Sequence, residues 1–336
     1  METADHQNAP AWLSDDQCQE LLGHWNSARL HSVTEPQAGT INTLRIAATD
    51  QGQFVLRLYR HHDRSRLERE HRVVAWIAEQ GLPAVVPLPT RTGATFAEWE
   101  GYFATLLPYI PHRQIARHRL QAAHIKAMGS FLGRLHRTLA QYPGTDIPPV
   151  RFTTDRRRTL AGIDHLEALI ESLPHPQDLD RHALQRLRTR RLWLQNRPPE
   201  DTAELASLPF QAVHGDYQES NIFFNGTDVA AVIDWDKIYT APPAWEVVRT
   251  LHLVLELQTT PSIAFVRAYR SQHPLSIGAL ETAARCYGLM RAYDLWLYEA
   301  IYQGGNQRLR AFVKRGDFAP LERDWTPLQE KIAALS

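Results

Sequence analysis

Two short acidic motifs between residues 213 and 236 carry the side chains best suited to chemistry. The first is H-G-D-x-x-x-x-N, from His214 to Asn221. The second is I-D-x-D, from Ile233 to Asp236, whose first acidic residue is Asp234. Carboxylate and amide oxygens are the ligands that Mg²⁺ prefers, and phosphoryl transfer also needs a carboxylate to accept the proton of the attacking hydroxyl. The pattern predicts Asp216 as that base, with Asn221 and Asp234 as metal ligands.

Each of these residues also has an ordinary structural explanation. An Asp in a turn most often caps the local backbone. The two motifs occur together, however, with eighteen residues from Asp216 to Asp234, and capping alone is a poor explanation for the whole combination. We therefore interpret residues 214–236 as a candidate site for phosphoryl transfer.

The residues around the motifs predict a β-hairpin that would bring them together. Asn225 and Gly226 form a strong hairpin-turn signal. The neighbouring β-prone runs lie at 212–213, 222–224 and 229–233. Because pairing across a turn joins the start of one strand to the end of its partner, we expect Asn221 and Asp234 at the same end of the sheet.

The rest of the chain divides into a first part rich in strands and a second part rich in helices. In the first hundred residues we expect a short helix capped by Ser14 or Asp15, strands at 41–48, 53–59, 85–88 and 101–107, and a helix at 65–80 that Gly81 ends. Beyond Pro111 we expect helices at 120–139, 155–172, 178–195 and 286–303, with helical structure from 245 to the end.

The composition limits the class of protein. The chain has 336 residues, 43 % apolar and 22 % charged, which suits one large folded domain or two lobes. Lys and Arg number 37, as do Asp and Glu, and this balance argues against a nucleic-acid or anionic-membrane partner. No Lys follows a Gly, which excludes the G-x-x-x-x-G-K-[ST] phosphate loop. Two cysteines, no signal peptide and no apolar run of about 20 residues predict a soluble, cytoplasmic protein.

The two motifs resemble the catalytic segment of the aminoglycoside phosphotransferase and choline kinase-like family. The family's H-G-D-x-x-x-x-N corresponds to His214–Asn221, and its I-D-[FW]-[DEG] corresponds to Ile233–Asp236. The resemblance implies an α+β, two-lobed protein-kinase-like fold, with a small antiparallel-sheet N-lobe that holds one key helix and a larger, mainly helical C-lobe. It implies an N-lobe at 1–107, a hinge at 108–111 and a C-lobe at 112–336, with the catalytic loop at 213–221 and the metal-binding segment at 233–236.

The same resemblance implies roles for the motif residues. Asp216 is the catalytic base, and Asn221 and Asp234 bind Mg²⁺. His214 is expected to be a structural residue that hydrogen-bonds the loop.

The resemblance also implies a basic strand residue that is paired with a helix Glu and steadies the phosphates of ATP. Arg57 stands where the family has Lys or Arg, and no Lys precedes residue 126. Arg is always charged and forks onto phosphate oxygens, so it suits this role. Its expected partner is Glu70, with Glu68 as the alternative. Arg57 could equally be an exposed strand residue.

Two further segments are expected to bind the nucleotide. The residues Gly39, Thr40 and Asn42 resemble a loose G-x-x-N phosphate loop, whose backbone N–H groups could cradle a phosphate, although a plain turn explains them equally well. The adenine would contact backbone groups near Leu106 to Tyr109.

The acceptor pocket is the least determined part. Acidic residues that could line it are Asp236, Glu256, Asp294 and Glu299, yet scattered helical acids are more often solvated. The Arg-rich helices at 155–195 are best explained as a solvated face, with an anion site as the alternative. The sixteen histidines offer no matched third metal ligand, and we expect them on the surface.

Taken together, the residues predict an ATP- and Mg²⁺-dependent kinase that phosphorylates a hydroxyl of a small molecule. A sugar or an aminoglycoside-type polyol is weakly favoured as the acceptor. The alternatives are a protein Ser/Thr kinase on the same fold and a nucleotide-binding regulatory protein without catalysis. The sequence leaves the identity of the acceptor, the choice between ATP and GTP, and the oligomeric state open.

Overall fold

The chain folds into two compact units. A computed structural model describes residues 13–25, 28–36, 42–151, 154–198 and 202–335. The first unit comprises Met1–Pro148 and His214–Tyr239, and the second comprises Pro149–Val213 and Thr240–Ser336. The predicted hinge at 108–111 falls inside the first unit, and the predicted lobe boundaries stay predictions.

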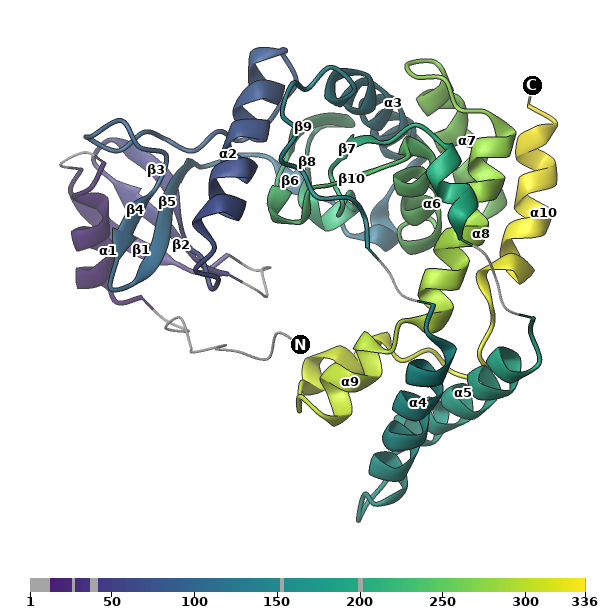
Figure 1. Ribbon diagram of the computed structural model, residues 1–336. Coiled ribbons are helices and arrows are strands. Elements are labelled where there is room, and N and C mark those ends of the chain that lie inside the picture. The colour runs from purple at the N-terminus through teal and green to yellow at the C-terminus, as the bar shows by residue number, and fades with distance from the viewer. Residues whose placement is uncertain (1–12, 26–27, 37–41, 152–153, 199–201, 336) are drawn as a thin grey trace. The chain divides into compact units, whose positions relative to one another are not determined.

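The first unit is built on a five-stranded antiparallel sheet in the order β1-β2-β3-β5-β4 (Figure 1). Its strands are β1 (Leu30–Thr34), β2 (Thr43–Thr49), β3 (Gly52–Leu58), β4 (Ala97–Trp99) and β5 (Tyr102–Pro108). The strands predicted at 53–59 and 101–107 form, as does the described part of the one at 41–48. The tight turn between β2 and β3 pairs Thr49 with Gly52.

One predicted strand is wrong, and two strands of this sheet, β1 and β4, were not predicted. Residues 85–88 have no strand structure, because Pro87 lacks the N–H that a sheet ladder needs. The segment still joins the sheet, since the backbone N–H of Leu88 donates to the carbonyl of Leu106 over 2.8 Å. The three-residue strand β4 is too short to show an alternating pattern in the sequence.

Side-chain caps mark the starts of two helices of the first unit, and the cap of the first one, Ser14, was predicted. Helix α1 (Asp15–Leu22) starts at Ser14, whose side chain and that of Gln17 form a reciprocal capping box. Helix α2 (Arg64–Glu79) starts after Asp63, whose carboxylate accepts a hydrogen bond from the third helical residue. Gly81 follows α2 with a φ of +77°, which glycine adopts without steric cost.

A three-stranded sheet and a long helix complete the first unit. The sheet has the order β6-β8-β9 and contains β6 (Arg113–Gln114), β8 (Ile222–Asn225) and β9 (Asp228–Val232). The helix is α3 (Ala122–Leu139), as the period at 120–139 predicts. Tyr217, in the loop before β8, is fully buried and donates to the carbonyl of Met128 on α3 over 2.9 Å. This bond ties the loop to the helix.

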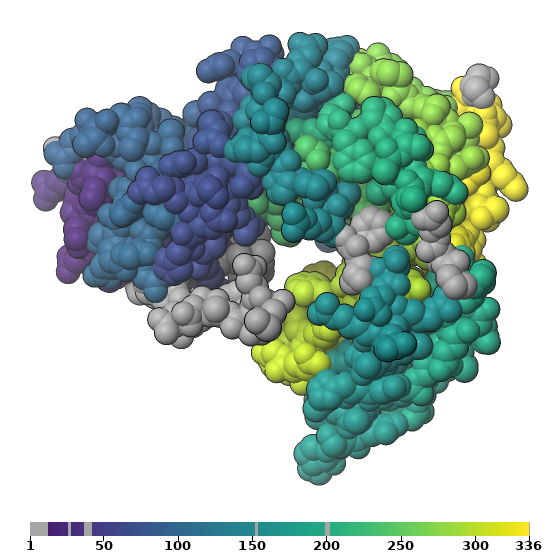
Figure 2. Space-filling model, viewed as in Figure 1, coloured from purple at the N-terminus to yellow at the C-terminus, as the bar shows by residue number. Residues whose placement is uncertain are grey.

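The second unit is mainly helical. Its helices are α4 (Arg156–Glu171), α5 (Asp178–Gln195), α6 (Pro243–Leu253), α7 (Thr259–Arg270), α8 (Ile277–Tyr293), α9 (Trp296–Tyr302) and α10 (Leu321–Ala333). The short strands β7 (Gln211–Val213) and β10 (Tyr239–Ala241) pair with each other. Helices α4 and α5 lie side by side in Figure 1, and the same pair forms a continuous teal surface in Figure 2. Their apolar faces pack in one core with those of α8 and α9.

The single helix expected at 286–303 is broken into α8 and α9. The cause is the buried guanidinium of Arg190 on α5, which donates to the carbonyls of Ala292 (2.7 Å) and Asp294 (2.7 Å) at the end of α8. These bonds satisfy carbonyls that a continuing helix would have used. The carboxylate of Asp294 then accepts from the backbone N–H of Trp296, which begins α9.

The expectation that the histidines lie on the surface is wrong for four of them. His71, His124, His136 and His214 are buried. Within the described part of the chain, no helix combines the length and the apolar character needed to cross a bilayer.

Candidate active site

The loop from His214 to Asn221 is held in shape by the histidine ring. The Nδ1 atom of His214 accepts from the backbone N–H of Asp216 (3.1 Å), and its Nε2 donates to the carbonyl of Ile233 (3.0 Å). These two bonds require the neutral ring with its proton on Nε2. His214 therefore fastens the loop to the second motif, in agreement with the structural role expected for it.

Gly215 allows the two motifs to touch through their backbones. Its φ is +82°, and a Cβ atom there would lie 2.3 Å from the carbonyl oxygen of Lys237. Only a residue without a side chain fits this approach. Backbone packing therefore requires a glycine at the second position of H-G-D in this chain.

Asp216 is buried at the centre of this arrangement. Its Oδ2 atom lies 3.1 Å from Nζ of Lys237 and 3.5 Å from Nε2 of Gln218. The carboxylate is only partly open to solvent, with 6 % of its side chain exposed. The motif pattern did not predict a role for Lys237, and the one signal available in the sequence was that it is the only lysine near either motif.

The predicted hairpin brings Asn221 and Asp234 together. Ile222 pairs with Val232, and the N–H of Ile233 donates to the carbonyl of Asn221 over 3.0 Å. The side-chain amide of Asn221 donates to the carbonyl of Asp216 over 2.9 Å, which leaves its amide oxygen as the atom able to bind a cation. Asp234 follows Ile233 in the chain, and its backbone is in the left-handed region with a φ of +67°.

The ion pair predicted between Arg57 and Glu70 forms. The guanidinium of Arg57, on β3, lies 3.0 Å from Oε1 of Glu70, on α2. Its other amino group lies 3.2 Å from Oδ1 of Asp234. The alternative partner Glu68 is exposed and pairs with Arg64 instead. Arg57 is buried, so it is not an exposed strand residue, and it links α2 to the second motif.

Burial and the charge of the ion-pair partner act in opposite directions on the pKa values of Arg57 and Glu70. Burial raises the pKa of Glu70 to about 7, against the opposing effect of the Arg57 charge. Burial alone would lower the pKa of Arg57, but Tyr59, Glu70 and Asp234 outweigh it and raise that pKa. The arginine therefore stays charged, while the glutamate titrates near neutral pH.

A second ion pair holds the end of the second motif. Arg66, on α2, donates to the backbone carbonyl of Asp236 (3.0 Å) and lies 3.3 Å from its Oδ2. Asp236 is buried, and burial together with the nearby carboxylate of Asp234 raises its pKa. These contacts give Asp236 a structural connection to α2, and its predicted contact with a substrate stays a prediction.

The residues predicted to form the phosphate loop and to contact the adenine are placed as follows. Gly39 and Thr40 lie outside the described residues. Asn42 accepts from the backbone N–H of Arg60 over 3.3 Å. Leu106 is buried within β5, whereas Tyr109 is exposed just beyond that strand. The predicted contacts of these residues with a nucleotide stay predictions.

The other three acidic residues predicted for the acceptor pocket lie in the second unit. Glu256 is exposed after α6, and Glu299 is exposed on α9. Asp294 pairs with Arg291 over 2.9 Å, besides capping α9. Their role in binding a substrate stays a prediction.

A metal could be held by Asn221 and Asp234. Across the described residues, no group of three or more His, Cys, Asp or Glu is arranged to hold a metal ion. Mg²⁺ does not require such a cage, because it is commonly bound by one or two carboxylates together with substrate phosphates and water. An amide oxygen and a carboxylate on neighbouring strand ends fit that requirement.

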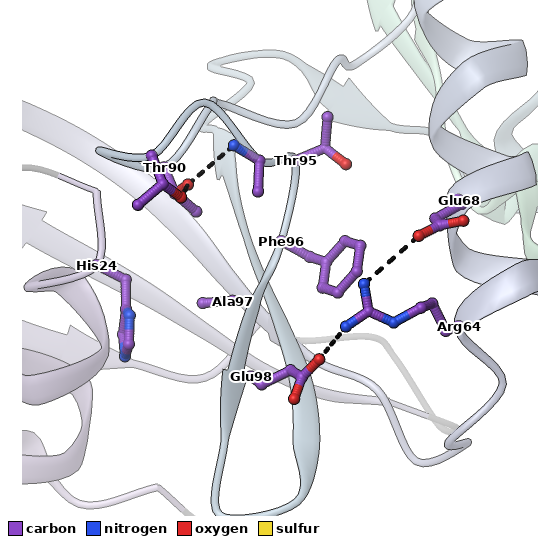
Figure 3. A pocket seen from close by; sticks show the side chains of 10 residues that line it. His24, Arg64, Glu68, Thr90, Thr95, Phe96, Ala97 and Glu98 are labelled. Carbon is purple, nitrogen blue, oxygen red and sulfur yellow. Dashed lines mark hydrogen bonds and ion pairs between the residues drawn. The ribbon is translucent and has the colours of Figure 1, made fainter.

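A pocket of about 500 Å³ lies in the first unit, and its lining does not include Asp216, Asn221 or Asp234 (Figure 3). Its wall includes Arg64, whose guanidinium lies between the carboxylates of Glu68 and Glu98 and 5.0 Å from the ring centre of Phe96. Because these two carboxylates already compensate the charge of Arg64, the guanidinium is a poor anchor for an anionic ligand.

Comparisons with known proteins agree with the fold described above. The family model of the phosphotransferase enzyme family matches residues 32–280. The homoserine kinase of Caulobacter vibrioides is 25% identical over 252 residues, covering 71% of this chain and 72% of that protein. The homoserine kinase of Methylobacillus flagellatus is 24% identical over 304 residues, covering 86% and 88%.

Solved structures show the same fold at low identity. The spectinomycin phosphotransferase APH(9)-Ia, solved with ADP and spectinomycin, has a TM-score of 0.65 at 15% identity and covers 94% of this chain and 99% of its own. The amicoumacin kinase hAmiN, solved with AMP-PNP and Ca²⁺, has a TM-score of 0.61 at 15% identity, with 96% and 94% covered. The predicted protein-kinase-like fold is confirmed.

The fold and the matches define a kinase that acts on a hydroxyl group, namely a small-molecule phosphotransferase. The chain belongs to the phosphotransferase enzyme family, as its motifs predicted.

Proposed function

We propose that the protein is an ATP- and Mg²⁺-dependent O-phosphotransferase that phosphorylates a small-molecule hydroxyl. One observation carries this proposal. The Arg57 guanidinium, held by Glu70 (3.0 Å), lies 3.2 Å from Asp234, and Asp234 follows the residue that bonds to Asn221. The side-chain amide of Asn221 also bonds to the backbone carbonyl of Asp216, so the packed segment that carries the proposed base also carries the two proposed oxygen donors for a metal.

Each residue would have a defined task. Arg57 would bind phosphate oxygens of the nucleotide, and Glu70 would keep the guanidinium in place. Asn221 and Asp234 would hold Mg²⁺, which would neutralise phosphate charge as it builds up. These assignments use side chains whose charges suit a polyphosphate.

Asp216 would act on the acceptor. The hydroxyl oxygen forms a bond to the γ-phosphorus while the bond from that phosphorus to the bridging oxygen breaks, and ADP leaves with the electron pair. The hydroxyl proton passes to the carboxylate of Asp216. A buried carboxylate that is held by neighbouring groups stays oriented for this task.

The acceptor that we favour is a sugar or an aminoglycoside-type polyol, as the sequence suggested. The names of the similar proteins add homoserine as a second compound to test. A protein acceptor is less favoured, because Ala241-Pro242-Pro243 begins soon after Asp234 and leaves little room for a peptide platform. ATP as the donor agrees with a cytoplasmic location.

A screen of hydroxylated compounds for ADP release tests the proposal. Purified protein is given ATP and Mg²⁺ with spectinomycin, other aminocyclitols, simple sugars or homoserine, and in a parallel arm with a protein mixture and radiolabelled ATP. We expect acceptor-dependent ADP release with one class of small molecule. Transfer of label to protein alone would favour the protein-kinase alternative. Tight binding of ATP without transfer to any acceptor would contradict the proposal.

A further inference from the structure

Lys237 forms an ion pair with the proposed catalytic base, and the proposed function gives this lysine no role. Its Nζ atom lies 3.1 Å from Oδ2 of Asp216. The carboxylate side chain is only 6 % exposed, whereas 45 % of the Lys237 side chain is exposed. One end of the lysine therefore reaches a buried acid, while much of the side chain remains accessible from outside.

The backbone of Lys237 is fixed against the catalytic loop. Its carbonyl oxygen occupies the space where a Cβ atom of Gly215 would lie, at 2.3 Å. Two residues earlier, the ring of Trp235 packs on His214 with 4.3 Å between ring centres. Trp235 to Lys237 form one 3₁₀ turn, so these two contacts set where the lysine side chain starts.

The arginines near the two motifs pair with other carboxylates. Arg57 pairs with Glu70 and Asp234, and Arg66 pairs with Asp236. Lys237 differs because its acid is the proposed base itself. An ammonium group has three N–H donors, and the bond to Asp216 uses one of them.

We propose that Lys237 is a further catalytic residue for phosphoryl transfer. Its ammonium group holds the Asp216 carboxylate toward the acceptor hydroxyl and offers its remaining N–H donors to the oxygens of the phosphoryl group in transit. This inference rests on the proposed function. The lysine keeps its proton throughout, since the hydroxyl proton passes to Asp216 and the electron pair of the broken P–O bond leaves with ADP.

The physical reason is the charge of the reacting group. Phosphoryl transfer spreads negative charge over the equatorial oxygens, and a fixed cation beside them lowers the barrier. A cation between the base and the phosphoryl group also reduces repulsion between the carboxylate and the phosphate oxygens. A purely structural ion pair would affect stability, and it would leave kcat unchanged in a variant that melts at the same temperature.

Three variants test this role. Lys237→Met removes the charge and keeps most of the side-chain length, and Lys237→Arg keeps the charge. Lys126→Met removes an exposed lysine on α3 and is the matched control. Steady-state kinetics are measured with MgATP and the acceptor found in the screen, or with water as the acceptor through slow ATP hydrolysis. Thermal unfolding of each variant is recorded alongside.

We expect Lys237→Met to lower kcat by about 10²-fold or more, which is the scale for loss of one fixed transition-state donor or cation. The KM for ATP should change by less than about three-fold, because the interaction forms mainly during transfer. Lys237→Arg should recover part of kcat, and Lys126→Met should match the unaltered protein. Equal melting temperatures would show that the loss is not one of folding.

Two results would overturn the inference. A Lys237→Met protein with unchanged kcat would make the ion pair merely structural, and one with increased kcat would make it an obstruction of the base. If Lys237→Met fails to fold, the kcat of Lys237→Arg and the kcat of Lys237→Ala with added methylamine are measured instead. If methylamine does not restore kcat in Lys237→Ala, the proposed role of Lys237 is contradicted. If the unaltered protein shows no acceptor-dependent turnover of MgATP at all, the proposed function itself fails, which separates the two outcomes.

Discussion

At the scale of single residues, the site depends on carboxylates that are held from several sides. Asp216 meets Lys237 at 3.1 Å, and Asp234 meets Arg57 at 3.2 Å. Glu70 completes the series from α2. Each acid forms an ion pair with a cation, so the substitution of one acid leaves the partner cation without the negative charge that compensates it.

Asp216→Asn should keep nucleotide binding and lose turnover by two or more orders of magnitude, on the order of 10²–10⁴-fold for the loss of a general base. The amide keeps the shape of the side chain but cannot accept the hydroxyl proton. Binding of an ATP analogue by calorimetry and ADP release with the identified acceptor measure the two properties separately. Near-normal turnover would remove Asp216 from the role of base.

Glu70→Gln should change how stability depends on pH. Burial raises the pKa of Glu70 to about 7 from its ordinary value of 4.5, so between these values the folded protein holds a proton that the unfolded chain has lost. The contribution of Glu70 to the free energy of unfolding therefore falls as pH rises through this interval. Glutamine does not titrate, so the variant lacks this slope.

Urea unfolding of both proteins at about pH 5 and about pH 8 measures the effect. Relative to Glu70→Gln, the unaltered protein should lose stability between the two pH values. A constant difference between the two proteins would contradict the assigned titration. Glu68→Gln, at the exposed position on the same helix, serves as the control.

At the scale of elements, the 3₁₀ turn at Trp235–Lys237 and the loop at His214–Asn221 are packed as one piece. The ring of His214 bonds to the carbonyl of Ile233 and packs on Trp235, and Gly215 meets the carbonyl of Lys237. The distance between the two motifs is therefore set by backbone packing as well as by the hairpin.

Gly215→Ala should damage both stability and turnover, because a methyl group cannot fit 2.3 Å from the carbonyl of Lys237. Gly226→Ala is the matched control, since Gly226 also has a positive φ, of +59°, but a methyl group there would meet nothing within 4 Å beyond its chain neighbours. The control should cost about 1 kcal/mol from the backbone alone. We expect Gly215→Ala to cost at least about 2 kcal/mol more in urea unfolding. Equal losses in the two variants would contradict the proposed close approach.

At the scale of the whole molecule, the two units divide the predicted tasks. The first unit, built from Met1–Pro148 and His214–Tyr239, holds every proposed metal, base and phosphate residue that the structure describes. The second unit holds three of the acidic residues that were predicted for the acceptor, namely Glu256, Asp294 and Glu299. Nucleotide binding should therefore be measurable without knowledge of the acceptor.

MgATP should raise the melting temperature. Saturation at one hundred times Kd adds about 2.7 kcal/mol to stability, which corresponds to roughly 5–10 °C for a unit of this size. Removal of Mg²⁺ with EDTA should abolish most of the shift, and Asp234→Asn should reduce it. Thermal unfolding with ATP alone, Mg²⁺ alone and both together is the measurement. An equal shift with and without Mg²⁺ would contradict a metal at Asn221 and Asp234.

The sequence by itself determined the features that depend on nearby residues. The Asn225-Gly226 turn determined the hairpin, and the spacing of the motifs then placed the backbone of Asn221 against that of Ile233, the residue before Asp234. Capping residues such as Ser14 fixed where helices begin. In each case the groups that decide the structure lie within a few residues or one hairpin of each other, so their types and spacing are sufficient.

Only the tertiary structure decided contacts between residues far apart in the chain. Glu68 and Glu70 both lie on α2, but their side chains point to different faces of the helix. Only Glu70 faces β3 and pairs with Arg57, whereas Glu68 pairs with Arg64. The bond from Arg57 to Asp234 spans 177 residues, and the break before α9 depends on Arg190. The physical reason is that a residue's type does not reveal its orientation, which is set by the core that buries it.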